Sequence, residues 1–488
     1  MELIEVALHR LGAAFVAGLH EPGYLLISTS EWGRTAQSYT MAGSPGLLGR
    51  WPGTDLNEAM AAFHAGTVIE VIGDPGGDYT IHWTRDGGTT PTQILLDAAY
   101  RFPGHERPSP RTPGVTDRRP TDPPVLAEVR ELVAEFIREH HAEGYPAGNT
   151  EEEILAAEDR LGVRLPEDLR ALYRVLPDDR TESGLLDPFV LAPLDRLVEW
   201  NAEAHPGYQD GVFDDPMIFD CDPPGHVRRV SSSSGWLTFA GDYGMNYAAV
   251  DLDPGPLGAH GQVVTHGRDV WAPVEYVAGS VRALLRRAID TLDEERDDPP
   301  PERWQTDSLT EVDDPAMIQE IVLADATDVR FADLDRFPNL KSIVVRDSPT
   351  PVDMTLPPAL PIERVNVTAP TFDPAVLTTA LTLSGIRLAG NRTPVPIAAL
   401  ATLPALLSLD LAEAEVTDIE SIATFPALRR LTLSAGQWTG LLATGWQPSS
   451  LAAAELAGPA GVAAATHWRR SLGHEATHRT LHGPRPAT

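Results

Sequence analysis

The pattern most able to do chemistry in this chain of 488 residues is the H-E-x-x-H spacing of His474, Glu475 and His478. On a helix, the two histidines of such a motif share one face and can bind zinc, while the glutamate can act as a general base. Here the motif lies close to Thr488 between basic and polar flanks, which leaves little sequence for a third ligand. We therefore expect no metal site, no cofactor and no enzymatic activity. A hydrolase that uses this motif is kept as a separate hypothesis.

Carboxylates gather at two other places, between Asp214 and Asp222 and at the pair Asp251 and Asp253. A calcium site needs about six to eight oxygen ligands, often from regularly spaced residues, and that spacing is absent here. Acidic loops of this kind usually only keep a surface solvated, and the specific alternative is contact with a basic protein. No Ser/His/Asp or Cys/His set has a spacing that indicates nucleophilic catalysis.

The charge of the whole chain is strongly negative, with 70 acidic residues against 38 Lys and Arg residues and a formal net charge of -32. Such a surface repels phosphate backbones, which argues against nucleic-acid binding, and it speeds association with basic proteins. The single cysteine, Cys221, cannot form an intrachain disulfide, which fits a reducing compartment. Its neighbours Asp220 and Asp222 should raise the pKa of its thiol, so we do not expect it to act as a nucleophile.

The N-terminal segment favours a cytoplasmic protein over a secreted one. Its apolar residues repeat at helical spacing, at Ile4, Leu8, Leu11, Phe15 and Leu19. This pattern predicts an amphipathic helix, whereas Glu2 and Glu5 occupy places where a secretory signal would be basic. No apolar run reaches the ~18 residues that a membrane span needs.

A pair of helices predicted between residues 150 and 176 must position any site that the central part of the chain carries. Thr150 and Glu153 form a capping-box pair at the start of the first helix. Gly162 stands where the C-cap is expected, and Pro166 suits the first turn of the second helix. The apolar faces of both helices follow at helical spacing, at Ile154, Ala157, Leu161, Leu169, Leu172, Tyr173 and Leu176. Packing alone explains this pair of helices, so any function must come from other features.

Two runs of sequence carry a family resemblance: residues 149–173, which contain LGVRLP at 161–166, and residues 235–264, which contain GDYG at 241–244. Together they resemble the SUKH superfamily, the domain of fungal cell-wall-synthesis regulators and of many bacterial immunity proteins. The resemblance implies an α+β domain that binds proteins. The sequence departs from the family in lacking its usual consecutive glycine pair, so the turn at 241–244 should differ.

The partner contacts that we expect lie at this turn and on the strands beside it. The turn itself offers a carboxylate and an aromatic ring, and the neighbouring strands offer further acids and a tryptophan. The predicted contact residues are Trp236, Asp242, Tyr243, Asp251 and Asp253. The acids would steer a basic partner, and an exposed aromatic residue would anchor it.

An internal repeat is the clearest physical signal beyond residue 303, with a six-residue core that reads apolar-x-x-apolar-x-apolar. Successive copies lie 22, 22, 21, 23 and 22 residues apart, and they begin at Ile318, Leu340, Ile362, Leu383, Leu406 and Leu428. The pattern resembles leucine-rich repeats, which implies one short parallel strand per copy around a shared core. Only Asn391 occupies the place where that family usually has asparagine, so we expect irregular turns. A degenerate seventh copy begins at Leu451.

Composition divides the chain into folded parts and linkers, and the expected fold class is α+β. The expected order is a small α+β domain at 1–102, a Pro-rich extended linker at 103–124, a SUKH-like domain at 125–292, an acidic and Pro-rich linker at 293–303, a leucine-rich-repeat solenoid with parallel strands at 304–458 and a His/Arg-rich tail at 459–488. Deletion of residues 467–488 should leave the fold intact.

The sequence therefore predicts a non-enzymatic protein that binds another protein, and not a nucleic acid or a membrane. The favoured hypothesis is an immunity-type protein of the SUKH class that neutralises or sequesters a basic bacterial toxin, for example a nuclease. The alternative is an interaction scaffold or regulator with endogenous partners. The sequence does not specify the oligomeric state, or whether the repeats or the SUKH-like domain make the main contact.

Overall fold

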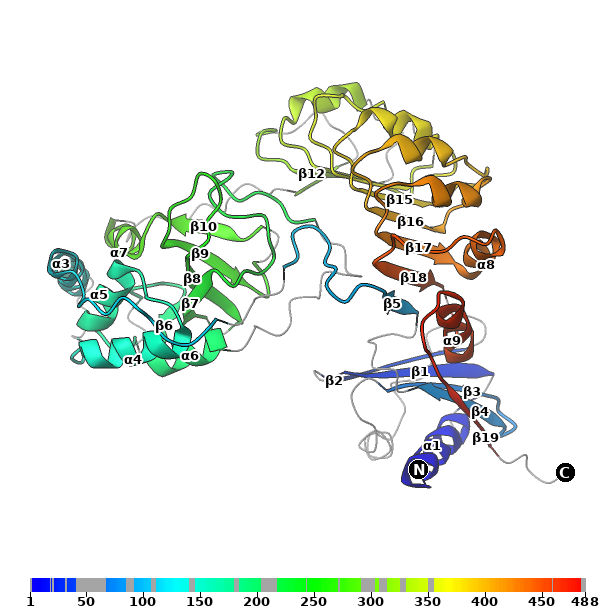
Figure 1. Ribbon diagram of the computed structural model, residues 1–488, viewed down its shortest axis with the longest axis horizontal. Helices are drawn as coiled ribbons and strands as arrows, with labels where there is room; N and C mark the ends of the chain where they lie inside the picture. The colour runs from blue at the N-terminus through cyan, green and yellow to red at the C-terminus, as the bar shows by residue number, and fades with distance from the viewer. Residues whose placement is uncertain are drawn as a thin grey trace. The chain divides into compact units, whose positions relative to one another are not determined.

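The computed structural model of the chain forms two compact units, Met1–Tyr100 together with Pro301–Thr488 (the terminal unit) and Arg101–Pro300 (the central unit) (Figure 1). The structure describes residues 2–17, 19, 22–30, 33–40, 67–84, 92–106, 111–139, 145–179, 184–202, 217–242, 244–270, 273–290, 303–306, 314–324, 331–349, 355–458 and 460–483. The sequence analysis expected separate folded domains in order along the chain. The structure instead unites the first and last parts and makes the central unit an insertion between them.

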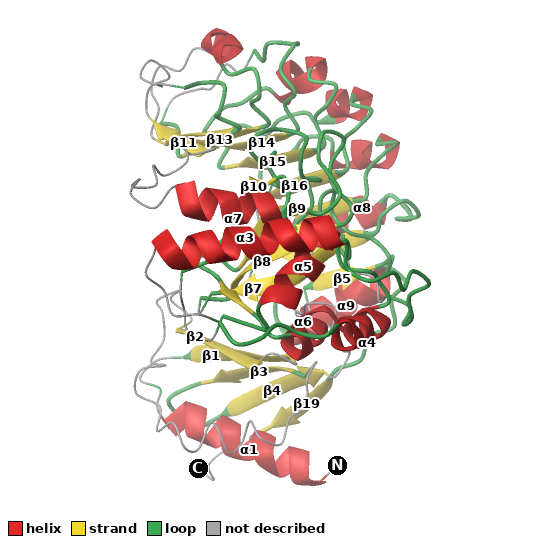
Figure 2. Cartoon of the chain, turned by 90° about the vertical axis from the view of Figure 1, so that its left-hand side faces the viewer, coloured by secondary structure: helices red, strands yellow, loops and turns green. Residues whose placement is uncertain are grey.

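The central unit is an antiparallel sheet with helices on one face (Figure 2). Its strands lie in the order β10-β9-β8-β7-β6 and are β6 (Val190–Leu191), β7 (Trp236–Gly241), β8 (Asn246–Asp251), β9 (Gln262–Gly267) and β10 (Glu275–Ala278). Its helices are α3 (Pro123–Glu139), α4 (Glu151–Leu161), α5 (Glu167–Val175), α6 (Leu194–Ala202) and α7 (Val281–Asp290). Helix α3 packs against α5 and α7.

The two faces of this sheet follow from the alternation of side chains along its strands. On β7, Leu237 and Phe239 point into the main core with the helices. Trp236 points to the opposite face, where it packs with Ala249 of β8 and Val264 of β9. Because Val227 and its neighbours in the preceding loop join this second cluster, both faces of the sheet are covered.

The caps of helix α4 confirm the expectations for the pair of helices. The Thr150 side chain accepts a hydrogen bond from the Glu153 amide at 3.2 Å, and the Glu153 carboxylate accepts one from the Thr150 amide at 2.7 Å. Gly162 ends the helix with φ 70°, in the left-handed region. Pro166 lies one position outside the predicted place, because α5 begins at Glu167 and Pro166 is its N-cap residue.

The Pro-rich stretch that was expected to be an extended linker is packed against the rest of the central unit. Residues 101–106 and 111–122 form an arm that contacts both the loop before β7 and the end of α4. The carbonyl of Gly104 accepts a hydrogen bond from the Ser231 amide at 2.7 Å. Arg118 makes hydrogen bonds of 2.8 and 2.7 Å to the carboxylate of Asp159. The prediction of a linker was wrong here, because tertiary hydrogen bonds satisfy a backbone whose composition favours extended structure.

The terminal unit contains a second antiparallel sheet, with helices on both faces. Its strands lie in the order β19-β4-β3-β1-β2 and are β1 (Gly23–Ser30), β2 (Gly33–Thr40), β3 (Val68–Gly73), β4 (Tyr79–Thr84) and β19 (Arg479–His482). Ile69 and Val71 of β3 pack with the apolar face of α1 (Glu2–Ala17), as the N-terminal periodicity predicted. Glu70 between them points to the other side, where its carboxylate accepts the Val462 amide of α9 (Val462–Ser471) at 3.1 Å. Figure 1 shows α1 and α9 on opposite sides of this sheet.

The repeats form parallel strands in the other sheet of the terminal unit. In the described residues this sheet has nine strands: β11 (Arg303–Thr306), β12 (Glu320–Ala324), β13 (Ser342–Arg346), β14 (Arg364–Thr368), β15 (Gly385–Ala389), β16 (Ser408–Glu413), β17 (Arg430–Ser434), β18 (Ala453–Ala457) and β5 (Gln93–Leu95). Neighbours from β11 to β18 pair in parallel, so equivalent repeat positions are aligned, for example Ile343 with Val365 and Leu409 with Leu431.

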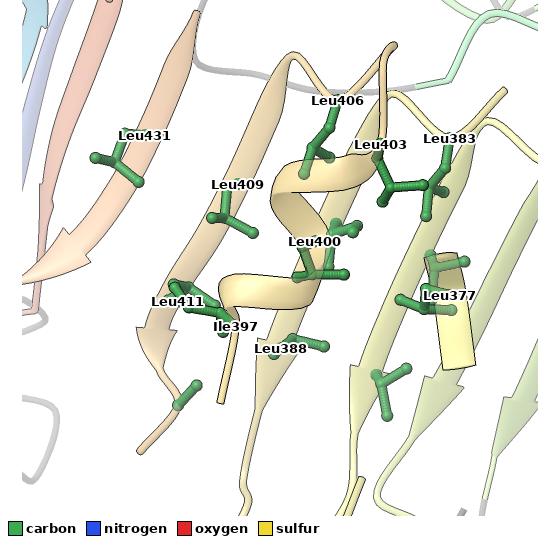
Figure 3. Packing of buried hydrophobic residues seen from close by; sticks show 14 of the residues in the cluster. Leu377, Leu383, Leu388, Ile397, Leu400, Leu403, Leu406, Leu409, Leu411 and Leu431 are labelled. Atoms are coloured by element: carbon green, nitrogen blue, oxygen red, sulfur yellow. The ribbon is translucent and has the colours of Figure 1, made fainter. Parts of the chain in front are cut away.

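Short helices carry the chain back between these strands and close the core. They are η2 (Phe331–Arg336), η3 (Pro374–Thr379), η4 (Ala398–Thr402), η5 (Ile419–Thr424) and α8 (Ala435–Ala443). Figure 3 shows Leu400 of η4 among Leu388, Leu409 and Leu411 of the strands, and these leucines are almost completely buried. The mixed helix and strand content agrees with the expected α+β class.

Residues 459–488, expected to be a removable tail, supply structural elements. Helix α9 buries Val462, Ala465 and Trp468, and β19 pairs with β4. The tail prediction was wrong because polar and basic residues dominate the segment, while the few apolar ones lie on one helix face. Deleting residues 467–488 would remove an edge strand and part of a buried helix, so we now expect it to destabilise the terminal unit.

The docked arm predicts a specific effect of adding one methyl group at Gly162. A Cβ there would lie 1.9 Å from the Thr112 carbonyl oxygen of the arm, whereas Gly114, with φ 102°, has nothing within 4 Å of such a Cβ. Alanine at either position costs about 1–2 kcal/mol for the left-handed backbone. Gly162→Ala must also displace the arm, so its loss should exceed that of Gly114→Ala by about 1 kcal/mol or more. Urea denaturation with amide exchange of α4 measures the difference; equal losses would mean that the arm is not held there.

Candidate functional site

The structure separates the predicted contact residues into buried and exposed groups. Trp236 is 5% exposed and Asp251 is fully buried at 0%. Trp236 and Asp251 are paired across β7 and β8, and their side chains lie on the face covered by the loop before β7. Neither can offer a surface for a partner in this fold, so the expectation that they contact a partner is corrected.

Asp251 holds the loop between β8 and β9 in place. One carboxylate oxygen accepts the Asp253 amide at 3.0 Å, and the other accepts the Gln262 side-chain amide, also at 3.0 Å. Gln262 in turn donates to the His226 carbonyl at 2.7 Å. Burial raises the pKa of Asp251, and these hydrogen bonds offset part of that rise. Its role is to organise loops, since every one of these contacts is internal.

Asp253 is exposed, but its charge is already paired. Arg228 forms an ion pair with Asp253 through one guanidinium nitrogen and a second, at 2.6 Å, with Glu106 through the other. Burial lowers the pKa of Arg228 and the two carboxylates raise it, with a net rise. Because Arg228 neutralises it locally, Asp253 contributes less to the attraction of a basic partner than the sequence suggested.

Asp242 organises the turn between β7 and β8. Its carboxylate accepts hydrogen bonds from the amides of Gly244 at 2.7 Å and Asn246 at 2.8 Å, and from the Asn246 side chain at 2.9 Å. Burial raises the pKa of Asp242, but the hydrogen bonds from Asn246 and Gly244 outweigh it and hold the pKa below its ordinary value. Tyr243, the other predicted residue of the turn, lies outside the described residues.

Asp269 is a second carboxylate at this turn that the sequence analysis missed. The Asn246 side chain donates to Asp242 at 2.9 Å and to Asp269 at 3.1 Å, and its own oxygen accepts the Asp269 amide at 2.9 Å. Hydrogen bonds from Arg268 and Asn246 lower the pKa of Asp269. Both carboxylates are therefore ionised at neutral pH. The β9–β10 connection brings Asp269 to the turn, and no local pattern in the sequence could indicate that.

Aromatic rings continue from this turn across the sheet. Ring centroids of Trp200 and Tyr247 lie 5.3 Å apart, those of Tyr247 and His266 5.6 Å, and those of His266 and Trp236 5.4 Å. Trp200 and Tyr247 are only partly buried, and a Cβ added at Gly241 would touch both rings. Because Gly241 directly precedes Asp242, the accessible end of this aromatic row borders the acidic turn. The sequence analysis did not single out Tyr247, for which period-2 alternation along β8 was the available signal.

We call this surface the β7–β8 turn face, made of Asp242, Asp269, Trp200, Tyr247 and the 51%-exposed Met245. It combines ionised carboxylates with partly exposed aromatic and apolar side chains. Such a combination suits binding of a protein segment that carries a positive charge, because a cation can approach both a carboxylate and a ring face. Nothing in its geometry provides a nucleophile with a base beside it.

His474 and His478 do not lie together on one helix. They lie in the connection between α9 and β19, and His474 bonds locally through Nδ1 to the Glu475 carbonyl oxygen at 3.0 Å. Within the described ranges, no three His, Cys, Asp or Glu side chains are placed to hold a metal ion. Among the helices that the structure describes, none combines the length and apolar composition needed to cross a membrane.

The hydrogen bonds of Asp242 predict a stability effect with a defined pH dependence. Asp242→Asn replaces a charged acceptor that receives these bonds, and should lower the free energy of unfolding of the central unit by about 1–2 kcal/mol at neutral pH. Because the folded pKa of Asp242 lies below 3.8, this contribution is complete above pH 3.8 and is lost as the pH falls through the folded pKa. Asp253→Asn is the matched control. Chemical denaturation across pH tests both, and a difference that grows toward acid would contradict the assignment.

Comparisons with known proteins identify the central domain. Residues 148–287 match the SMI1 / KNR4 family (SUKH-1). The chain is 31% identical over 163 residues to a cell wall biosynthesis/cell cycle regulator smi1 of Schizosaccharomyces pombe, an alignment that covers 30% of this chain and 32% of that protein. It is 40% identical over 47 residues to a KNR4/SMI1 homolog of Kluyveromyces lactis, covering 10% of this chain and 9% of that protein.

A glucan synthesis regulatory protein of Neurospora crassa is 40% identical over 50 residues, which cover 10% of this chain and 9% of that protein. The chain therefore spans about a third or less of the length of these relatives. The matched range contains α4, α5 and the β7–β8 turn, on which the resemblance in the sequence was based. Residues 148–287 of this chain are thus similar to the SMI1/KNR4 (SUKH-1) domain.

Proposed function

We propose that the protein binds a protein partner through the β7–β8 turn face of its SMI1/KNR4 domain, without catalysing a reaction. The observation that carries the proposal is the ionised carboxylate of Asp242, which Asn246 holds beside the partly buried rings of Trp200 and Tyr247. Asp269 lies at the same turn but is already paired with Arg268 at 3.2 Å. Trp and Tyr are among the residues that most often anchor interfaces, and carboxylates at their rim steer cationic partners.

The partner that this chemistry favours is a basic protein. With a net charge of -32, the chain as a whole attracts cationic proteins over the distance of the Debye length. A bacterial toxin of the nuclease type would be such a partner, and in that case the protein would act as an immunity protein in the cytoplasm. The free, buried Cys221 is compatible with that compartment.

The second candidate is an interaction scaffold or regulator with endogenous partners. Two of the three relatives reported are regulators of cell-wall biosynthesis, the cell cycle or glucan synthesis by name, and none of the three is named as an immunity protein. The parallel strands β12–β18 at the repeat spacing support a leucine-rich-repeat solenoid as a second binding surface. A scaffold of this kind would retain partners on the terminal unit even when the β7–β8 turn face is altered.

Capture of partners by the tagged full-length chain, followed by mass spectrometry, would separate the two candidates. An immunity protein should retain one basic protein and abolish its toxicity at equal concentration. A scaffold should retain several proteins and neutralise none. Repeating the capture with the Asp242→Asn variant would show which partners depend on the β7–β8 turn face.

The proposed face makes a kinetic prediction. Replacing Asp242 with Asn should slow association with a basic partner about two- to fivefold at low salt, because rim charges act mainly on the association rate. The difference should shrink as salt rises from about 0.05 to about 0.5 M and the Debye length shortens. Asp253→Asn and Asp269→Asn are the controls, since Arg228 and Arg268 already pair with those carboxylates. Association that is unchanged in the Asp242→Asn variant and across salt would exclude this face as the binding surface.

A further inference from the structure

The C-terminal strand β19 is attached to β4 by two reciprocal pairs of histidine and threonine. Across the strands, Thr480 pairs with His82 and His482 pairs with Thr80. His82 Nδ1 and the Thr480 hydroxyl are 3.0 Å apart, and His482 Nδ1 and the Thr80 hydroxyl are 3.2 Å apart. An imidazole nitrogen can serve as donor or acceptor toward a hydroxyl, so each pair can form one hydrogen bond across the two strands.

A third histidine packs on the same group. The ring of His478, just before β19, meets the ring of His82 edge-on, with centroids 5.9 Å apart. His478 Nδ1 is buried and has no hydrogen-bond partner among the described residues. His474, the other histidine of the H-E-x-x-H motif, instead bonds locally to Glu475.

The charged groups around these histidines offer little compensation for a positive charge. Arg479 of β19 stacks on Trp83 at 5.5 Å and adds a positive charge, and α9 contributes the further bases His467, Arg469 and Arg470. On β3, Glu70 is the cross-strand neighbour of His82, but its carboxylate receives the α9 amide of Val462.

The remaining titratable neighbours lie outside this group. Glu475 is exposed in the connection before β19. On the other face of the sheet, His9 of α1 bonds to Tyr79 at 3.0 Å. Among the described residues, no carboxylate forms a hydrogen bond or ion pair with His82, His478 or His482.

We infer that His82, His478 and His482 form a pH-sensitive clasp, which holds β19 on β4 while His82 is neutral and releases it when His82 is protonated. A charge on the half-buried ring of His82 carries a cost of burial and meets two neighbouring imidazoles. Release of β19 would uncover the backbone edge of β4 and detach the end of the chain from the N-terminal sheet. The inference does not depend on the proposed partner-binding function.

The sign of the pH effect follows from His82. Burial lowers its pKa from the ordinary value of 6.5, and His478 and His482 lower it further. Its contribution to stability is therefore complete above pH 6.5 and is lost as the pH falls through the folded pKa. Burial raises the pKa of Glu70, so Glu70 has the opposite sign and favours the fold as the pH falls. Loosening toward acid would thus identify the histidines and not Glu70.

Hydrogen–deuterium exchange of the full-length chain tests the clasp. Exchange at β4 and β19 is compared at about pH 7.5 and about pH 5.5, after correction for the intrinsic pH dependence of amide exchange. In the wild type, protection of these strands should fall several-fold, and about tenfold is the limit for one histidine that stays neutral in the folded state. Peptides from β1 and from β8 should keep their protection, which excludes general acid unfolding.

Matched variants separate the effect of charge on the histidines from the effect of losing their contacts. In the triple variant, His82→Asn and His482→Asn keep a polar group opposite each threonine, while His478→Phe keeps the ring contact. This variant should lose the pH dependence and stay protected at both pH values, whereas His474→Asn should behave as the wild type. Each single variant is measured as well, in case the triple variant does not fold. Equal protection of wild-type β19 at both pH values, or an unchanged drop in the triple and single variants, would overturn the clasp.

Discussion

The open edge of a parallel sheet is the constraint on which the arrangement of this chain depends. Each repeat strand forms backbone hydrogen bonds with its neighbours, but no further repeat follows the last one, β18, to pair with its outer edge. Strand β5 closes it from the other end of the sequence, with the Leu456 amide bonded to the Thr92 carbonyl at 2.8 Å and the Leu96 amide to the Ala452 carbonyl at 2.8 Å. Ile94 of β5 enters the repeat core. The contact makes residues 1–100 and 301–488 one unit, so the SMI1/KNR4 domain must be an insertion.

Within the central unit, a buried guanidinium ties together the helices of the family motif. Arg170 of α5 lies 2.5 Å from Glu158 and 2.6 Å from Glu151, both on α4. Glu151 also accepts the Thr121 amide at 3.1 Å, which attaches the arm. A buried ion pair is weak evidence for added stability, but loss of one partner leaves an uncompensated charge and is strongly destabilising. The arm precedes the range that matches the family, yet it shares this cluster with the family's first helices.

The features of the fold that the sequence predicts are those set by interactions between residues close together in the chain. The capping box at Thr150 and the left-handed Gly162 depend on residues close in sequence, and the register of the repeats depends on a constant period. The sequence alone can therefore predict these features. The pairings of β5 with β18 and of β19 with β4 join residues hundreds of positions apart, and no short pattern encodes them. The same limit applies to the site: alternation places Trp236 and Asp251 on one face, but only tertiary packing by the loop before β7 shows that this face is covered.

Net charge was the weakest guide to the binding surface, because many of the acids are already used internally. Glu158 and Asp159 pair with Arg170 and Arg118, and Asp251 is buried among loop amides. Asp410 in the repeat sheet follows the same rule: burial raises its pKa, while the amide of Ala412 and Arg387 offset part of that rise. A carboxylate can steer a partner only if it is ionised, accessible and not neutralised by a neighbouring arginine. Asp242 fulfils these conditions through amide donors that bring no charge, which is the physical reason for placing the contact at the β7–β8 turn face and not at Asp253.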